Sequence, residues 1–153
     1  KLYESRELSS LNLNTYFGDL VELLRQSYFS GDERIQIRFQ AVNARVLIDT
    51  AIPLGLILNE LVTNAIRHAF PGEREGEIRV RLAHGKKKTL HLTVSDNGVG
   101  LPQGFDVEKD GNLGLTTMLN LARNQLDGEV FLKTRKGVSC TIILKGEKYN
   151  PRV

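Results

Sequence analysis

Hydrophobic residues recur along this chain with two different spacings, which separate the expected helices from the expected strands. An apolar residue at every third or fourth position predicts three helices, at about 14–27, from near Pro53 to just before Pro71, and at about 115–126. The first has an apolar face made of Phe17, Leu20, Val21 and Leu24. Side chains that can cap the first two helices are Asn14 and, for the long helix, Asp49 or Thr50.

Strict alternation of apolar and polar residues predicts strands between these helices. Gly31-Asp32 is expected to break the first helix, and alternation then predicts strands at 35–39, 46–48, 77–83, 89–95, 128–134 and 138–145. The turn around Gly85-Lys86 joins two of them into a hairpin, and the last two form a closing hairpin. Helices over one face of a mixed, mainly antiparallel sheet give an α+β fold, a two-layer α/β sandwich.

A chain of 153 residues is expected to form one domain with a proper core. Residues 1–12 are polar and mixed, so we expect them to be the end of a linker, and we assign 13–148 to the domain. The chain begins at Lys1 and not at a methionine, which suggests a piece of a longer protein.

Composition and charge exclude several classes of function. Hydrophobic residues make up 41% and charged residues 25% of the chain, as in ordinary globular proteins. The net charge of +3 owes much to Lys86-Lys87-Lys88, which we interpret as a solvated hairpin tip, so no nucleic-acid partner is expected. A single cysteine, Cys140, fits a reducing compartment, and no stretch has the ~20 apolar residues of a membrane span. We therefore expect a cytoplasmic protein, or the cytoplasmic part of a membrane-attached sensor.

The long helix carries a polar stripe on an otherwise apolar body. At 3.6 residues per turn, Glu60, Asn64 and Arg67 fall on one narrow face. These polar groups are costly to bury unless something polar meets them. A carboxamide oxygen suits a hard cation such as Mg²⁺, and a guanidinium suits phosphate, so this face indicates a Mg-phosphate site.

A second polar motif, Asp96-Asn-Gly-Val-Gly-Leu-Pro102, follows a predicted strand. Asp-Asn-Gly by itself is also a strong hairpin signal. However, residues 99–102 do not restart an alternating strand, and Pro102 cannot donate to a ladder. The carboxylate of Asp96 can accept a hydrogen bond from an exocyclic amine, and the glycines let backbone approach a ligand, which indicates a purine-base site.

These two motifs resemble the N box and the G1 box of the GHKL ATPase superfamily, which joins gyrase-type ATPases, heat-shock chaperones, histidine kinases and mismatch-repair ATPases. Residues 112–118, Asn-Leu-Gly-Leu-Thr-Thr-Met, resemble its G2 box, and residues 137–144 resemble its closing strand. Residues 49–60 are similar to sensor histidine kinases of the HisKA_2 type. The resemblance implies the Bergerat ATP-binding fold, ATP or ADP as ligand and Mg²⁺ as cofactor.

The resemblance also implies roles for individual residues. It implies that Asn64 binds Mg²⁺ and that Glu60 is catalytic, either polarising the attacking nucleophile or holding a magnesium-bound water. It makes Asp96 the acceptor for the adenine amino group. The remaining residues with an implied nucleotide contact are Arg67, His68, Gly98, Gly100, Leu113, Gly114, Leu115 and Thr141. Residues 103–113 correspond to the lid over ATP, and the chain departs from the family by Asn112 at the first glycine of the G2 box and by Val138 beside Gly137.

The function implied is that of the catalytic and ATP-binding domain of a sensor histidine kinase. Such a domain transfers the γ-phosphoryl group of ATP to a histidine on a separate dimerisation domain, which we expect upstream of Lys1. A response regulator would be an indirect partner, and the whole protein would be a homodimer. Two alternatives are an anti-sigma-factor serine kinase, which has a similar N box, and a GHKL module that binds ATP as a conformational clamp.

Overall fold

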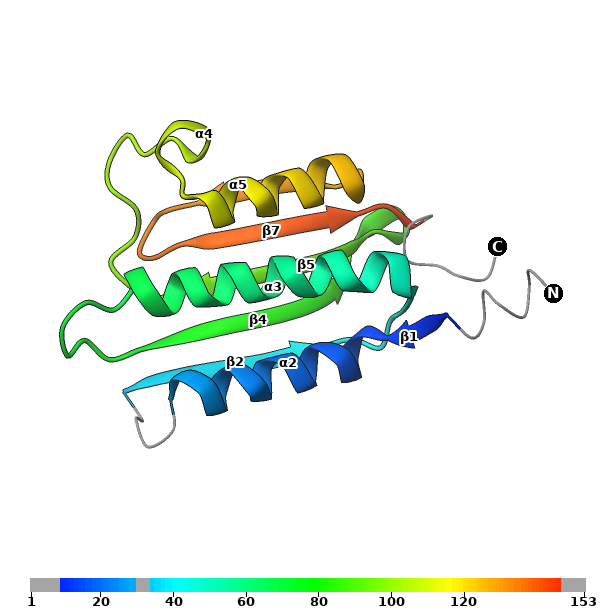
Figure 1. Cartoon of the computed structure of the whole chain (residues 1–153), viewed down its shortest axis with the longest axis horizontal. Helices are drawn as coiled ribbons and strands as arrows, with labels where there is room; N and C mark the ends of the chain where they lie inside the picture. Colours follow the sequence, from blue (N-terminus) through cyan, green and yellow to red (C-terminus); the bar gives the residue numbers. More distant parts are fainter. Residues whose placement is uncertain (1–8, 30–33, 147–153) are drawn as a thin grey trace.

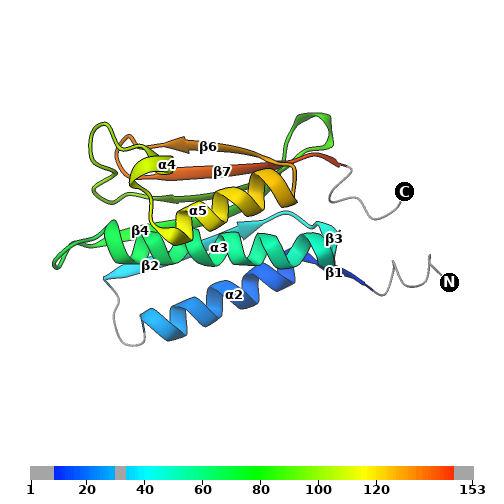
Figure 2. The same cartoon turned by 45° about the horizontal axis from the view of Figure 1, so that its top comes forward.

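A computed structural model describes residues 9–29 and 34–146 of the chain, shown in Figure 1. The expected helix break at Gly31-Asp32, linker residues 1–8 and domain residues 147–148 lie outside the described residues. Helices lie over one face of a five-stranded sheet, which is the two-layer arrangement predicted from the sequence (Figure 2). The predicted α+β fold is thus confirmed.

The sheet has the strand order β2-β4-β5-β7-β6. Its strands are β2 (Ile35–Ala41), β4 (Gly76–His84), β5 (Leu90–Asp96), β7 (Ser139–Leu144) and β6 (Glu129–Lys133). The edge strand β2 pairs in parallel with β4, and every other neighbouring pair is antiparallel. The sheet is therefore mixed and mainly antiparallel, as predicted.

Three helices form the second layer: α2 (Leu13–Tyr28), α3 (Ile48–His68) and α5 (Leu113–Asn120). The long helix α3 crosses the middle of the sheet between α2 and α5 (Figure 1). The single turn α4 (Val107–Asp110) lies in the segment before α5, and a π-helical segment, η2 (Leu121–Gln125), continues α5. The short 3₁₀ segment η1 (Lys86–Lys88) forms the β4–β5 turn.

The core lies between the two layers and follows from the period-two pattern of the strands. Inward residues such as Ile78, Val80 and Leu92 are almost fully buried, and they pack under apolar residues of α3 such as Ile57 and Leu58. Burial of each such side chain contributes about 1.5–3 kcal/mol. The apolar face of α3 thus holds this helix against the sheet, and its polar stripe is left for the site described below.

The structure differs from the sequence-based prediction at the entry to the domain. Three residues that we expected in the linker form β1 (Ser10–Asn12), which pairs antiparallel with β3 (Arg45–Leu47). Asn12, and not Asn14, caps α2, because its side chain accepts hydrogen bonds from the N–H groups of Asn14 and Thr15.

The long helix also begins earlier than predicted, at Ile48 and not near Pro53. Leu47 is its N-cap residue and makes no side-chain capping bond, so neither Asp49 nor Thr50 is the cap. The N–H of Ile48 instead donates to the carbonyl of Ser9 at 2.7 Å, which ties the helix start to the β1–β3 pair. Within the described part of the chain, no helix is long and apolar enough to cross a membrane.

Candidate functional site

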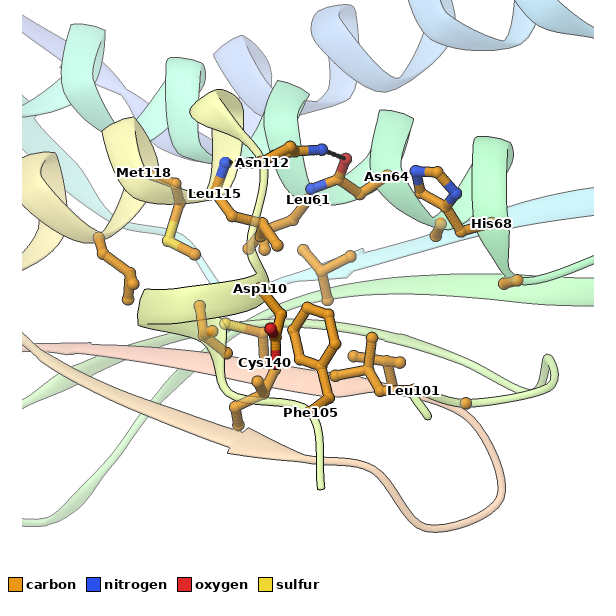
Figure 3. Close-up of a pocket in the computed structure, with 18 of the residues that line it drawn as sticks. Leu61, Asn64, His68, Leu101, Phe105, Asp110, Asn112, Leu115, Met118 and Cys140 are labelled. Atoms are coloured by element: carbon orange, nitrogen blue, oxygen red, sulfur yellow. Dashed lines mark hydrogen bonds between the residues drawn. The ribbon is translucent and has the colours of Figure 1, made fainter. Parts of the chain in front are cut away.

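A cavity of about 700 Å³ lies between the C-terminal half of α3, the ends of β5 and β7, the segment 97–112 and α5. Most of its wall is apolar, with side chains such as Leu61, Val94, Met118 and Val138. A large apolar cavity with a few convergent polar groups is typical of a small-molecule site. Figure 3 shows Asn64 and His68 reaching the cavity from α3, opposite Leu101 and Phe105.

Asp96 provides a carboxylate at the C-terminal end of β5. Its Oδ1 atom accepts hydrogen bonds from the N–H groups of Gly98, at 2.8 Å, and Val138, at 3.2 Å. Both bonds go to one oxygen, so they fix the orientation of the carboxylate and leave Oδ2 able to accept from a ligand. Asp96 lines the cavity, as expected for a residue that binds a base.

The two glycines after Asp96 shape the wall in different ways. Gly98 packs on the end of α3, where a Cβ atom would lie 2.3 Å from the carbonyl oxygen of Ala69. Gly98 therefore lets the loop contact α3, although its own atoms do not line the cavity. Gly100 lines the cavity with a φ of +79°, a conformation that favours glycine.

The polar stripe of α3 is divided between the cavity and the surface. Asn64 and His68 lie one turn apart and both line the cavity. Arg67 is exposed and is not part of the cavity wall. Glu60, one turn before Asn64, lies beside the wall under the first turn of α5, where a Cβ atom on Gly114 would be 2.2 Å from its Oε2.

Two polar atoms of this stripe are buried without a hydrogen-bond partner among the described residues: Oε2 of Glu60 and Nδ2 of Asn64. Such atoms are costly to leave unsatisfied, so they point to a missing polar ligand. The carboxylate oxygen of Glu60 is of the kind that Mg²⁺ prefers, whereas the amide nitrogen of Asn64 is a donor and suits an acceptor such as a phosphate oxygen. The described residues contain no group of three or more His, Cys, Asp and Glu that could hold a metal.

The three residues of the G2 box that we expected to contact the nucleotide lie differently relative to the cavity. Leu115 lines the cavity, whereas Leu113 is 83% exposed and Gly114 contacts the Glu60 side of α3. Asn112 has an extended backbone, with a φ of −78°, and is the N-cap of α5. Asn112 therefore replaces the first glycine of the G2 box without a left-handed backbone conformation.

The structure places Thr141 away from the cavity. Its hydroxyl lies 2.9 Å from that of Thr93 on β5, while its neighbour Cys140 lines the cavity. Successive residues of a strand point to opposite faces of the sheet. Thr141 therefore points away from the face on which its neighbour Cys140 lines the cavity. Thr141 is therefore not among the residues that line the cavity, and its nucleotide contact stays a prediction from the resemblance.

Several apolar wall residues were not assigned a nucleotide contact from the sequence, namely Leu101, Phe105, Val107, Met118 and Cys140. Their apolar character alone does not distinguish a cavity wall from a core. Burial raises the pKa of the Cys140 thiol to about 12, so this group stays protonated at neutral pH. An ion pair between Glu108 and Arg123, at 3.2 Å, links α4 to η2 at the cavity rim.

Comparison with known proteins gives relatives among sensor histidine kinases. The chain is 30% identical over 131 residues to the blue-light-activated histidine kinase 2 of Erythrobacter litoralis, an alignment that covers 86% of this chain and 36% of that protein. It is 38% identical over 98 residues to the sensor histidine kinase PdtaS of Mycobacterium tuberculosis, covering 63% of this chain and 19% of PdtaS. The chain thus spans about a fifth to a third of these relatives.

A shorter match joins the chain to the serine-protein kinase RsbW of Listeria innocua, with 42% identity over 55 residues, 36% of this chain and 32% of RsbW. Among solved structures, the histidine kinase domain of a blue-light-activated histidine kinase from Erythrobacter litoralis has a TM-score of 0.82 at 27% identity. That alignment covers 91% of this chain and 67% of that one.

The family model described as histidine kinase-, DNA gyrase B- and HSP90-like ATPase matches residues 49–148. This range contains α3, the Asp96 loop, α5 and the closing strand β7, which are the elements that surround the cavity. The chain therefore belongs to the histidine kinase-, DNA gyrase B- and HSP90-like ATPase family.

Proposed function

We propose that this chain is the ATP-binding catalytic domain of a sensor histidine kinase, which transfers the γ-phosphoryl group of ATP to a histidine on a separate dimerisation domain. The observation that carries the proposal is the meeting of Asp96, Asn64 and His68 on one cavity, although they come from β5 and α3. The family and the relatives above support the same reaction.

In the proposed site, the carboxylate of Asp96 binds the adenine amino group, and the apolar wall packs on the base. His68 packs along the nucleotide, and the amide oxygen of Asn64 is the protein ligand of Mg²⁺. The metal would neutralise charge on the phosphates, as in other phosphoryl transfers. Glu60 is placed next to that position, where a buried carboxylate can hold a water or accept the proton of the nucleophile.

Arg67 has a less direct role in this proposal. It is exposed and lies outside the cavity wall. From there it can reach phosphate oxygens only at the open side of the site, so we assign it a long-range electrostatic contribution.

The partners follow from the proposed reaction. A histidine-bearing dimerisation domain supplies the acceptor, the whole protein is a homodimer, and a response regulator receives the phosphoryl group afterwards. We place the domain in the cytoplasm, alone or as part of a membrane-attached sensor, because one free cysteine fits a reducing compartment. Within the sensor histidine kinases, we assign the chain to the HisKA_2 type, on the similarity of residues 49–60.

The serine-kinase alternative rests on the RsbW match, which covers 36% of this chain. We favour the histidine kinase because the match to the blue-light-activated kinase covers 86% of the chain. A clamp-type ATPase has no comparable support among these relatives.

The test is incubation of this chain with γ-labelled ATP, with and without the upstream domain of the same protein. We expect no stable label on the chain alone, because His68 lies in the nucleotide cavity, and His84 and His91 lie on the β4–β5 hairpin. Adding the upstream domain should give an acid-labile phosphohistidine on that domain.

Three outcomes would count against the proposal. Acid-labile label on this chain alone would show that the acceptor is inside it. Acid-stable label on a partner serine would favour the anti-sigma-factor kinase. No binding of ATP or ADP by well-folded protein would reject the site itself.

A further inference from the structure

A side-chain hydrogen bond joins the end of the lid to the N-box helix. Nδ2 of Asn112 donates a hydrogen bond to Oδ1 of Asn64 at 3.4 Å, across 48 residues of sequence. Figure 3 shows this contact between the start of α5 and α3. The accepting atom is the oxygen that the proposed function assigns to Mg²⁺.

The orientation of both amides is fixed by a second hydrogen bond. Oδ1 of Asn112 accepts from the N–H of Leu115 at 2.8 Å, because Asn112 is the N-cap of α5. Its other atom, Nδ2, must therefore be the one that faces Asn64. Since an amide nitrogen only donates, Asn64 must present its oxygen there. The Asn64 oxygen is thus held by the Asn112 amide.

The neighbouring turn covers the second N-box group. Gly114 lies so close to the Glu60 carboxylate that a Cβ atom would be within 2.4 Å of both of its oxygens. Together, Asn112 and Gly114 place the first turn of α5 over both Asn64 and Glu60. The first turn of α5 therefore covers both N-box side chains.

We propose that Asn112 is a positioning residue that sets how strongly magnesium assists nucleotide binding. This inference rests on the proposed function. The Asn112 amide holds the Asn64 oxygen, and a magnesium–nucleotide complex displaces it at the cost of the Asn112–Asn64 hydrogen bond. A nucleotide without metal does not need the Asn64 oxygen, so it does not incur this cost.

The test variant is Asn112→Ser. Serine keeps an oxygen that can cap α5, but it lacks an amide and is too short to reach Asn64. The control is Asn124→Ser, because the Asn124 amide contacts Asn120 at 3.4 Å and is not part of the cavity wall. Calorimetry measures ADP binding to each variant, once with excess Mg²⁺ and once with a chelator.

We expect Asn112→Ser to bind Mg-ADP more tightly than wild type by roughly two- to tenfold, the range for one net hydrogen bond. Its affinity for metal-free ADP should not change, and Asn124→Ser should match wild type in both conditions. Equal changes with and without metal, no change, or weaker Mg-ADP binding would each overturn the inference.

A second measurement needs no nucleotide. The side-chain amide resonances of Asn64 should shift in nucleotide-free Asn112→Ser and stay in place in Asn124→Ser. Unchanged Asn64 resonances in Asn112→Ser would reject the contact itself. If this shift is seen but wild type binds ADP in neither condition, the contact exists, and both the proposed function and the magnesium role of Asn112 are rejected.

Discussion

Asp96 and Val138 hydrogen-bond to each other in both directions at the edge of the cavity. The N–H of Asp96 donates to the carbonyl of Val138 at 2.9 Å, and the N–H of Val138 donates to Oδ1 of Asp96 at 3.2 Å. One carboxylate oxygen therefore holds β7 against β5, and the other is left for a ligand. A substitution that keeps Oδ1 and removes Oδ2 therefore separates the structural role of Asp96 from its proposed role in ligand binding.

Asp96→Asn keeps Oδ1 as an acceptor and replaces Oδ2 by an amide NH₂ group. This group only donates, so it cannot accept a hydrogen bond from the adenine amino group. We expect ADP affinity to fall by about ten- to a hundredfold, since a hydrogen bond to a charged group contributes roughly 1.5–3 kcal/mol. The thermal unfolding temperature should stay close to that of wild type. Asp96→Ala is the matched comparison and should lose both affinity and thermal stability. Unchanged ADP affinity in Asp96→Asn would contradict the base-binding role.

Asn64→Ala should impair magnesium-dependent binding more than metal-free binding. The lost oxygen is the proposed metal ligand, whereas the base contact at Asp96 remains. Titration of ADP with Mg²⁺ and with a chelator measures the two effects. Asn59→Ala is the control, because Asn59 lies on the same helix and is exposed. If phosphotransfer to the upstream domain and the magnesium effect both survive Asn64→Ala, the metal assignment is wrong.

Stability should fall at alkaline pH because of Cys140. Burial raises the pKa of its thiol to about 12, whereas an unfolded thiol ionises near pH ~8.5. The unfolded state therefore loses this proton first, and the contribution is fully present below pH ~8.5 and declines as pH rises towards 12. The free energy of unfolding should lose up to about 1.4 kcal/mol per pH unit in that window. Urea unfolding at pH 7.5 and 9.5 should show this loss in wild type and not in Cys140→Ala. An equal pH slope in both proteins would reject it.

Arg34 should stabilise the loop that follows α3. Its Nη1 atom donates to three carbonyl oxygens, those of Phe70, Gly72 and Arg74, at 3.3, 2.8 and 2.9 Å. Arg34→Gln should lower the free energy of unfolding by roughly 1–3 kcal/mol, because these carbonyls lose a charged donor. Arg38→Gln is the control, since Arg38 forms an exposed ion pair with Glu77, which is worth about 0–1 kcal/mol. Chemical denaturation measures both, and equal losses would contradict the prediction.

The layers and most elements were predictable because each long element carries a clear apolar period. β1 was not, since its three residues are too few to show alternation, whereas β3 was predicted one residue late, at 46–48. The cap of α2 was misplaced because Asn12 and Asn14 stand two positions apart and both can accept from helix N–H groups. The start of α3 was misplaced because proline is typical of a first turn, whereas Pro53 lies one turn further in.

The site was predictable where a motif and its local element agree. Asp96 and Gly100 follow a strand, and Asn64 and His68 share a helix face, so the resemblance placed them on the cavity. Thr141 shows the opposite case, because the alternation with buried Ile142 already directs it to the other face. The Asn112–Asn64 contact joins residues 48 positions apart, and no local pattern indicates it.

The strand order also determines when the cavity forms during folding. β4 with β5, and β6 with β7, are hairpins closed by short turns, so each forms at little cost in loop entropy. The β5–β7 pairing must instead bring Asp96 to Val138 across 42 residues, which makes it a slower step. The proposed base-binding carboxylate lies on the seam between these two folding units. A nucleotide bound there should therefore hold the seam closed, so that its stabilising effect appears mainly as slower unfolding.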